Sequence, residues 1–211
     1  MEPLVLLRDV ALFASSVTIL EPISLSISSG EAIGIVGPNG SGKSTLLRIL
    51  ATLASPSEGA GAVLGATLGS REVLGVRHRI GLVGHLPALT PSLTLHENLS
   101  FYARLAGIGA DRVGTALEAV GLASAQHRQA VDCSAGMKKR ADLARLVLDP
   151  AELLLLDEPT DTLDRSARSL VDHLVLTTIR SGGAAIVVSH DRTNLVEWIH
   201  RIHSLENGRL R

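Results

Sequence analysis

The chain has 211 residues, a formal net charge of −1, 45% hydrophobic residues and only 2% aromatic ones. A chain of this length buries roughly 70% of its unfolded surface, and its charge balance excludes both a basic nucleic-acid-binding field and an acidic disordered tail. Its single cysteine, Cys133, excludes an internal disulfide and favours a reducing compartment.

The first residues do not have the pattern of a signal peptide. No basic segment precedes residues 4–7, and Arg8 and Asp9 soon interrupt this apolar run. No stretch reaches the ~20 apolar residues that are needed to span a bilayer. If the protein serves a membrane process, we expect another chain to supply the membrane part.

In chain order, alternating apolar and polar residues predict an antiparallel hairpin over residues 4–12 and 17–28. A buried strand is expected at 32–36, and a helix at 44–53 that ends before Pro56 and Gly59. This half of the chain ends with a small strand at 62–64, an exposed segment with Arg71, Arg77 and Arg79, and a strand at 80–83.

The second half begins with a helical region over about 88–148. Helices are expected there at 95–106, 111–120 and 137–148. This region is followed by a strand at 153–156, a helix at 163–180, a strand at 184–188, a helix at 192–198 and a strand at 199–205, with a hairpin turn at 206–208. Alternating strands and helices predict one α/β unit with a mostly parallel sheet and an inserted helical lobe.

Residues 37–45 match the GxxxxGK[ST] pattern between a predicted strand and a predicted helix, which is the context that this motif requires. Backbone amides of such a loop bind phosphate oxygens, the lysine reaches the β- and γ-phosphates, and the following serine binds Mg²⁺. The alternative is a glycine turn that caps a helix and leaves the lysine solvated. The residues concerned are Gly37, Pro38, Asn39, Gly40, Ser41, Gly42, Lys43, Ser44 and Thr45.

Acidic side chains follow the leucine strand at 153–156. Because ligands of a parallel sheet lie at the carboxyl ends of its strands, we expect Asp157 to hold Mg²⁺ and Glu158 to act as the general base on water. An acidic helix cap is the alternative. His190, which follows the strand at 184–188, could bond the γ-phosphate and the water.

These motifs, in this order, resemble those of the ATP-binding-cassette (ABC) ATPases over the whole chain. The resemblance implies a P-loop NTPase fold with a RecA-like core, an N-terminal antiparallel β-subdomain and an inserted helical subdomain. The family's LSGGQ signature corresponds to CSAGM at 133–137, where Ser134 and Gly136 match and Cys133, Ala135 and Met137 depart. Ser134 and Gly136 would bind ATP held by a partner ATPase subunit, either a second copy or a different one.

Further positions take their roles from the resemblance. Residues 161–164 match the loop whose last residue, Asp164, reaches across the dimer, although an Asp that caps the next helix is equally possible. Phe13 is placed to stack on adenine, with core burial as the alternative. His85 stands where the family has a glutamine that bonds Mg²⁺ and water, and an imidazole can accept a hydrogen bond from that water shell.

The Gly-His pair at 84–85, the SAG at 134–136 and the segment 97–107 resemble the haem-exporter ATPases of cytochrome c maturation. This implies an integral-membrane permease as partner, ATP and Mg²⁺ as cofactors, and a peripheral position on the cytoplasmic face of the membrane. No nucleic acid and no haem ligation by this chain are expected. The alternatives are an ATPase of a drug or lipid exporter, a soluble ABC protein of DNA repair or translation, and a nucleotide-binding scaffold without hydrolysis.

Overall fold

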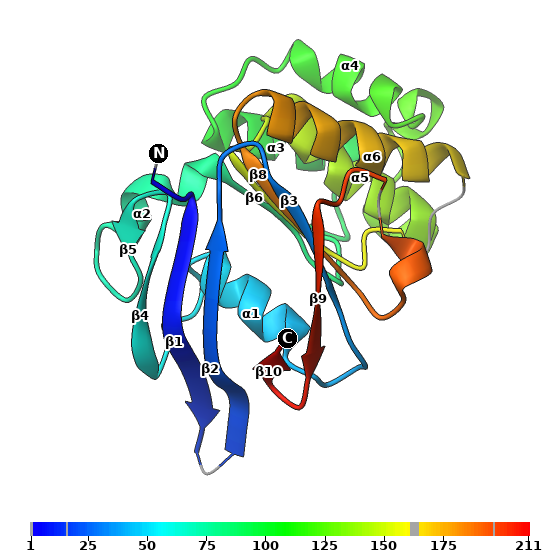
Figure 1. The fold of residues 1–211 in the computed structure, drawn as a ribbon. Helices are drawn as coiled ribbons and strands as arrows, with labels where there is room; N and C mark the ends of the chain where they lie inside the picture. The colour runs from blue at the N-terminus through cyan, green and yellow to red at the C-terminus, as the bar shows by residue number, and fades with distance from the viewer. Residues whose placement is uncertain (1, 16, 161–164, 196) are drawn as a thin grey trace.

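A computed structural model describes residues 2–15, 17–160, 165–195 and 197–211, which form two sheets with helices between and beside them (Figure 1). The first sheet is antiparallel, with the strand order β2-β1-β4-β5. Buried Val5, Leu7 and Val10 of β1 face the core and fix the register against β2 and β4. Its strands are β1 (Val5–Ala14), β2 (Val17–Ile27), β4 (Glu58–Val63) and β5 (Ala66–Thr67).

The second sheet has the order β10-β9-β3-β8-β7-β6 and is parallel except for the final pair, β9 and β10. Every residue of β3, β7 and β8 is buried, which explains why β3 is apolar throughout and why β7 and β8 are apolar up to their last residues, Asp157 and Ser189. Their carboxyl ends lie at one edge. The strands are β3 (Ala32–Val36), β6 (Ile80–Val83), β7 (Leu153–Asp157), β8 (Ala184–Ser189), β9 (Arg201–Glu206) and β10 (Arg209–Leu210).

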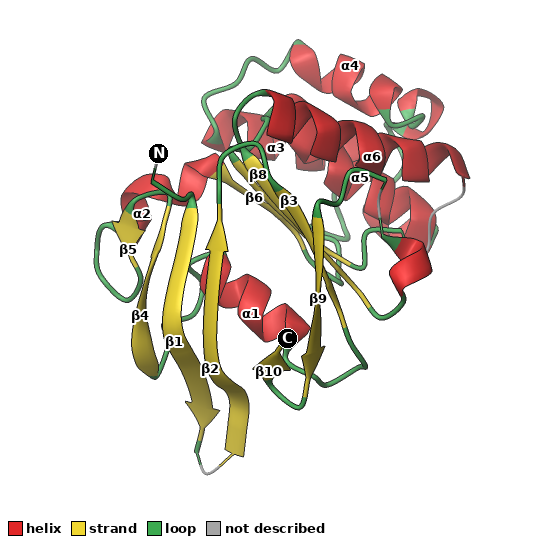
Figure 2. Ribbon diagram, in the orientation of Figure 1, coloured by secondary structure: helices red, strands yellow, loops and turns green. Residues whose placement is uncertain are grey.

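Helices fill the space between the sheets and cover the far face of the parallel one (Figure 2). Helix α1 lies between the two sheets, α5 and α6 pack on the other face, and α3 and α4 pack on α5. In the described part of the chain, no helix is both long and apolar enough to cross a membrane. The helices are α1 (Lys43–Leu50), α2 (Val73–Val76), α3 (Leu95–Leu105), α4 (Arg112–Ala119), α5 (Ala135–Leu148) and α6 (Arg165–Arg180), with short 3₁₀ turns at Arg77–Arg79, Ala123–Ala125, Ala130–Asp132 and Arg192–Asn194.

The fold class is the predicted one, whereas several boundaries differ. Helix α1 ends at Leu50 rather than at residue 53, because Thr52 takes a left-handed φ of 59° and Arg77 donates hydrogen bonds to the Thr52 carbonyl and hydroxyl. A residue 25 positions away thus satisfies a carbonyl at the end of this helix, which no local pattern could reveal. The strand expected at 62–64 begins at Glu58, where it pairs with β1.

The helix predicted at 192–198 is wrong. Only a 3₁₀ turn at Arg192–Asn194 forms, since the Asp191 carboxylate accepts the Thr193 amide and Leu195 already has extended backbone angles. Leu195 packs against the core beside Gly34 of β3, and this contact replaces a second helical turn. Residues 161–164, predicted to begin the α6 region and to carry Asp164, lie outside the described residues.

Candidate functional site

The glycine loop, residues 37–42, joins β3 to α1 at the carboxyl edge of the parallel sheet. Gly40 and Gly42 have φ angles of +79° and +103°, a region that L side chains avoid. Gly37 lies so close to the Leu205 carbonyl that a Cβ would overlap it. The loop is therefore confined by its own backbone and by the C-terminal hairpin, whose Gly208 amide donates to the Ser41 carbonyl at 3.2 Å.

Lys43 is buried at the start of α1, and its ammonium is held by the glycine loop. The Nζ atom donates to the carbonyl oxygens of Gly37 (2.6 Å) and Pro38 (3.0 Å). The alternative, in which the glycine turn only caps the helix and leaves Lys43 solvated, is therefore excluded in this structure. An ammonium in this position adds positive charge to a loop whose amides already favour an anion.

The acidic end of β7 meets this loop directly. Ser44 Oγ donates to Asp157 Oδ2 at 2.7 Å, although 113 positions separate the two residues. Glu158 is buried and has a φ of 46°, an uncommon angle outside glycine that is found at functional sites. Its Oε2 accepts from Ser189 Oγ at 3.0 Å, and its Oε1 lies 3.1 Å from His190 Nδ1.

Lys43, Ser44, Asp157, Glu158 and His190 line one open cavity of about 470 Å³. The sequence predicted every residue of its lining except Ile19 of β2, whose apolar strand pattern gives no sign of this position. The cavity combines amides and an ammonium, which suit an anion, with hydroxyl and carboxylate oxygens, which suit a hard cation. The lining consists of Ile19, Asn39, Gly40, Gly42, Lys43, Ser44, Thr45, His85, Asp157, Glu158 and His190.

Other predicted site residues lie elsewhere. Gly37, Pro38 and Ser41 do not line the cavity, and the first two supply the carbonyls that hold Lys43. Phe13, near the end of β1, is 39% exposed, so the core-burial alternative is wrong, and it does not line the cavity either.

The two matching residues of the signature, Ser134 and Gly136, also lie outside this cavity. Ser134 caps α5 by accepting the Met137 amide at 3.2 Å, and Gly136 lies in the first turn of that helix. A Ser cap at a helix start leaves backbone amides directed outwards, which suits an anion supplied by another molecule.

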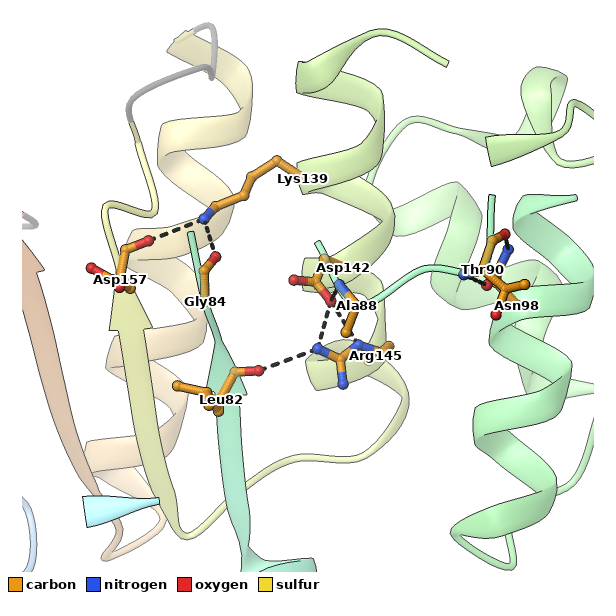
Figure 3. A network of polar contacts seen from close by, with 9 residues as sticks. All are labelled: Leu82, Gly84, Ala88, Thr90, Asn98, Lys139, Asp142, Arg145 and Asp157. Carbon is orange, nitrogen blue, oxygen red and sulfur yellow. Dashed lines mark hydrogen bonds and ion pairs between the residues drawn. The ribbon is translucent and has the colours of Figure 1, made fainter. Parts of the chain in front are cut away.

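A polar network that sequence reasoning missed joins α5 to this edge (Figure 3). Buried Lys139 donates to the carbonyls of Gly84 (3.0 Å) and Asp157 (3.1 Å). Further along α5, Asp142 is fully buried; burial raises the pKa of its carboxyl, and the Arg145 guanidinium opposes that shift. The basic run at residues 138–140 ordinarily indicates a solvated face, so only the fold reveals that Lys139 is buried.

Comparisons with known proteins agree with this geometry. The family model described as "ABC transporter" matches residues 20–161. A cytochrome c biogenesis ATP-binding export protein of Rhodospirillum rubrum is 42% identical over 177 residues, covering 82% of this chain and 74% of that protein. The protein of the same name from Xanthomonas campestris is 40% identical over 190 residues, covering 89% and 87% of the two chains.

Solved structures show the same fold. A dimeric post-hydrolysis state of an ATP-binding cassette, bound to ADP and Pi, superposes with a TM-score of 0.87 at 27% identity, covering 98% of this chain and 97% of that one. A dimeric bacterial ABC transporter cassette gives a TM-score of 0.85, again at 27% identity, with the same coverage.

Proposed function

Because this chain belongs to the ABC transporter family of ATP-hydrolysing subunits, we propose that it powers a separate membrane permease in export for cytochrome c biogenesis, with haem as the transported group. The observation that supports ATP chemistry is the meeting of Lys43, Ser44 and the acidic end of β7 at one cavity. The export role follows from the 40–42% identity to proteins of that name.

Phosphate binding would use the glycine loop and Lys43. The ammonium that now donates to the Gly37 and Pro38 carbonyls would exchange these acceptors for the β- and γ-phosphate oxygens of ATP. Charged phosphate oxygens are the stronger acceptors, so the exchange favours binding. Amides at the start of α1 would add to the attraction.

Mg²⁺ would be held by Ser44 and Asp157, with His85 contacting its water shell. The 2.7 Å contact between the Ser44 hydroxyl and the Asp157 carboxylate brings together two oxygen ligands of the kind that Mg²⁺ prefers. A bound Mg²⁺ would neutralise charge that develops on the β- and γ-phosphates.

Hydrolysis would depend on Glu158, which lies next to Asp157 and faces the same cavity. Its carboxylate would orient the attacking water and accept its proton, while His190 would donate a hydrogen bond to the γ-phosphate. Ser189 holds one carboxylate oxygen and the neighbouring His190 lies against the other, so the base is pre-positioned.

Two copies would enclose each ATP, as expected of a family whose solved cassettes include dimers. The cavity is open, and Ser134 lies outside it at the capped start of α5. A second chain would bring its Ser134 and Gly136 to the γ-phosphate. Phe13, exposed near the end of β1, would stack on the adenine.

Nucleotide binding is tested by Lys43→Ala, with Arg48→Ala on the exposed face of the same helix as the control. We expect the first change to abolish ATP binding and the second to leave the affinity unchanged. An unchanged affinity of the Lys43→Ala chain would refute the role of the glycine loop.

Dimer closure is tested by Glu158→Gln, which should retain ATP without hydrolysing it and accumulate as a dimer in light scattering. If this variant stays monomeric with ATP and Mg²⁺, the enclosed-ATP arrangement is wrong.

The export role is tested by purifying the chain from membranes with its bound partners, where we expect it at the cytoplasmic face. A permease whose loss, like the Glu158→Gln change, stops maturation of c-type cytochromes supports the proposal. A drug or lipid permease as the co-purifying chain, with normal c-type cytochromes in the variant, would favour the alternative.

A further inference from the structure

Helix α5 carries a row of polar side chains at Lys139, Asp142 and Arg145, which turn inward rather than toward solvent. Lys139 is 4% exposed and Asp142 is not exposed at all. Spacing of three residues places all of them on one face of the helix. Because buried charges are destabilising unless they are paired or hydrogen-bonded, such a row needs specific donors and acceptors on the neighbouring elements.

The acceptors and donors lie along one segment, residues 82–88, which contains the end of β6 and the loop of His85. Arg145 donates to the Leu82 carbonyl at 3.2 Å, Lys139 to the Gly84 carbonyl at 3.0 Å, and the Ala88 amide donates to Asp142 at 3.3 Å (Figure 3). Helix α5 therefore contacts this segment on both sides of His85.

Lys139 also reaches the neighbouring strand. The same ammonium donates to the main-chain carbonyl of Asp157 at 3.1 Å, and the Asp157 side chain accepts from Ser44. One buried cation thus joins α5 to two segments whose side chains, Asp157 and His85, line the ATP cavity.

The start of the same helix is the surface proposed to meet the partner's ATP. Ser134 caps α5, and Lys139 follows five residues later, about 7.5 Å along the axis of a rigid helix. A displacement of the helix start on contact with the partner's nucleotide would reach the Lys139 ammonium within one and a half turns.

We infer that Lys139 is a positioning residue that couples the two ATP sites of a dimer, because it ties the helix that meets the partner's ATP to Asp157 and the His85 loop of its own site. The inference rests on the proposed function. Occupation of one site would fix Asp157 and His85 in the other, so that the two ATP molecules bind cooperatively.

The experiment uses the full chain with Glu158→Gln, which removes hydrolysis from the measurement. Into this background we introduce Lys139→Met, which keeps the alkyl chain but removes the ammonium, and Lys139→Arg, which retains the donors. Lys138→Met is the matched control, since the Lys138 ammonium donates to the carbonyl of exposed Val131 at 3.3 Å rather than to Gly84 or Asp157. Two quantities are measured: ATP affinity at protein concentrations where the chain is monomeric, and the ATP dependence of dimer formation in light scattering.

With Lys139→Met we expect the ATP affinity of the monomer to change by less than about twofold. Half-maximal dimer formation should need about tenfold more ATP, and the Hill coefficient of dimer formation should fall from about 2 toward 1. Lys139→Arg should restore most of the cooperativity, and Lys138→Met should keep it. Should the Met variant fail to fold, Lys139→Gln, which leaves a shorter and neutral donor, is measured in its place, and a smaller loss of cooperativity in the same direction is expected.

A merely structural lysine would lower thermal stability without separating these two measurements. Three results overturn the inference and leave the proposed function standing. The first is equal dimer formation with and without the Lys139 ammonium. The second is a loss of cooperativity in Lys138→Met equal to that in Lys139→Met, and the third is a Lys139→Arg chain as defective as Lys139→Met. If the Glu158→Gln chain itself does not dimerise with ATP, the proposed function fails and the inference fails with it.

Discussion

Gly37→Ala tests the packing that confines the glycine loop. A Cβ at this position would overlap the main-chain carbonyl oxygen of Leu205 and lie 3.1 Å from Ser41 Oγ. Leu205 is fully buried in β9 and paired with Leu210, so its carbonyl cannot withdraw without disturbing the sheet. The substitution is therefore an overpacking change against backbone, at the upper end of the usual cost, about 3 kcal/mol.

The matched control is Gly40→Ala in the same loop. Nothing lies within 4 Å of a Cβ at Gly40, but its φ of +79° is strained for alanine. This strain costs about 1–2 kcal/mol. In a chain of this size each kcal/mol lowers the Tm by about 2–4 °C, so Gly37→Ala should melt about 6–12 °C below wild type and Gly40→Ala less far below it.

Circular dichroism of the nucleotide-free chains measures both transitions. The comparison isolates overlap from backbone strain because both glycines belong to one six-residue loop. If Gly37→Ala melts no lower than Gly40→Ala, the close approach of Leu205 does not constrain the loop, and the explanation for this glycine is refuted.

Burial, followed by the Asp149 carboxylate that accepts its hydroxyl at 3.0 Å, raises the pKa of Tyr102 to about 12. Since the pKa of Tyr102 is higher in the folded chain than in the unfolded one, its contribution to stability is present below the unfolded pKa and is lost as the pH rises through about 12. In Asp149→Asn, the phenolate absorbance of this single tyrosine should titrate at a lower pH than in the wild type. An unshifted titration midpoint would count against the contact between Tyr102 and Asp149. Thr94→Ala should cost about 1 kcal/mol in urea unfolding, because it removes the cap of α3. It should also raise the pKa of Glu97, since the Thr94 amide and the Thr94 hydroxyl both lower that pKa and the substitution removes the hydroxyl. An unchanged unfolding midpoint would show that the cap is not stabilising. Leu155→Ala, at a fully buried position of β7, should cost about 2–5 kcal/mol with an unchanged denaturant m-value, and a loss below 1 kcal/mol would contradict the packing described here.

Local chemistry explains why the strands and helices around the site were predictable. β3 and β8 are short runs of apolar residues buried on both faces, and β7 is an apolar run that ends in Asp157; they alternate with helices, a pattern that indicates a parallel sheet without knowledge of contacts. Because the carboxyl ends of parallel strands share one edge, the sequence predicts that the glycine loop, Asp157 and His190 lie together. Asn39, Gly40 and Gly42 of the loop line one cavity with Asp157 and His190.

Errors arose where a distant residue decides the local conformation. The extra turn predicted for α1 is absent because Arg77, from another element, bonds the Thr52 carbonyl. The helix predicted at 192–198 gives way to a short turn because Leu195 packs against the core. Neither contact has a signal within the segment that it changes.

The glycine loop, the order of strands and helices and the residues proposed to bind ATP and Mg²⁺ can all be derived from the amino-acid sequence, because they depend on backbone freedom and on patterns of neighbouring side chains. The folded chain was needed to show that Lys139 is buried between Gly84 and Asp157, that Ser189 holds Glu158, and that Phe13 is exposed. The partners of a side chain across a fold are set by the packing of whole elements, and adjacent residues do not encode that packing.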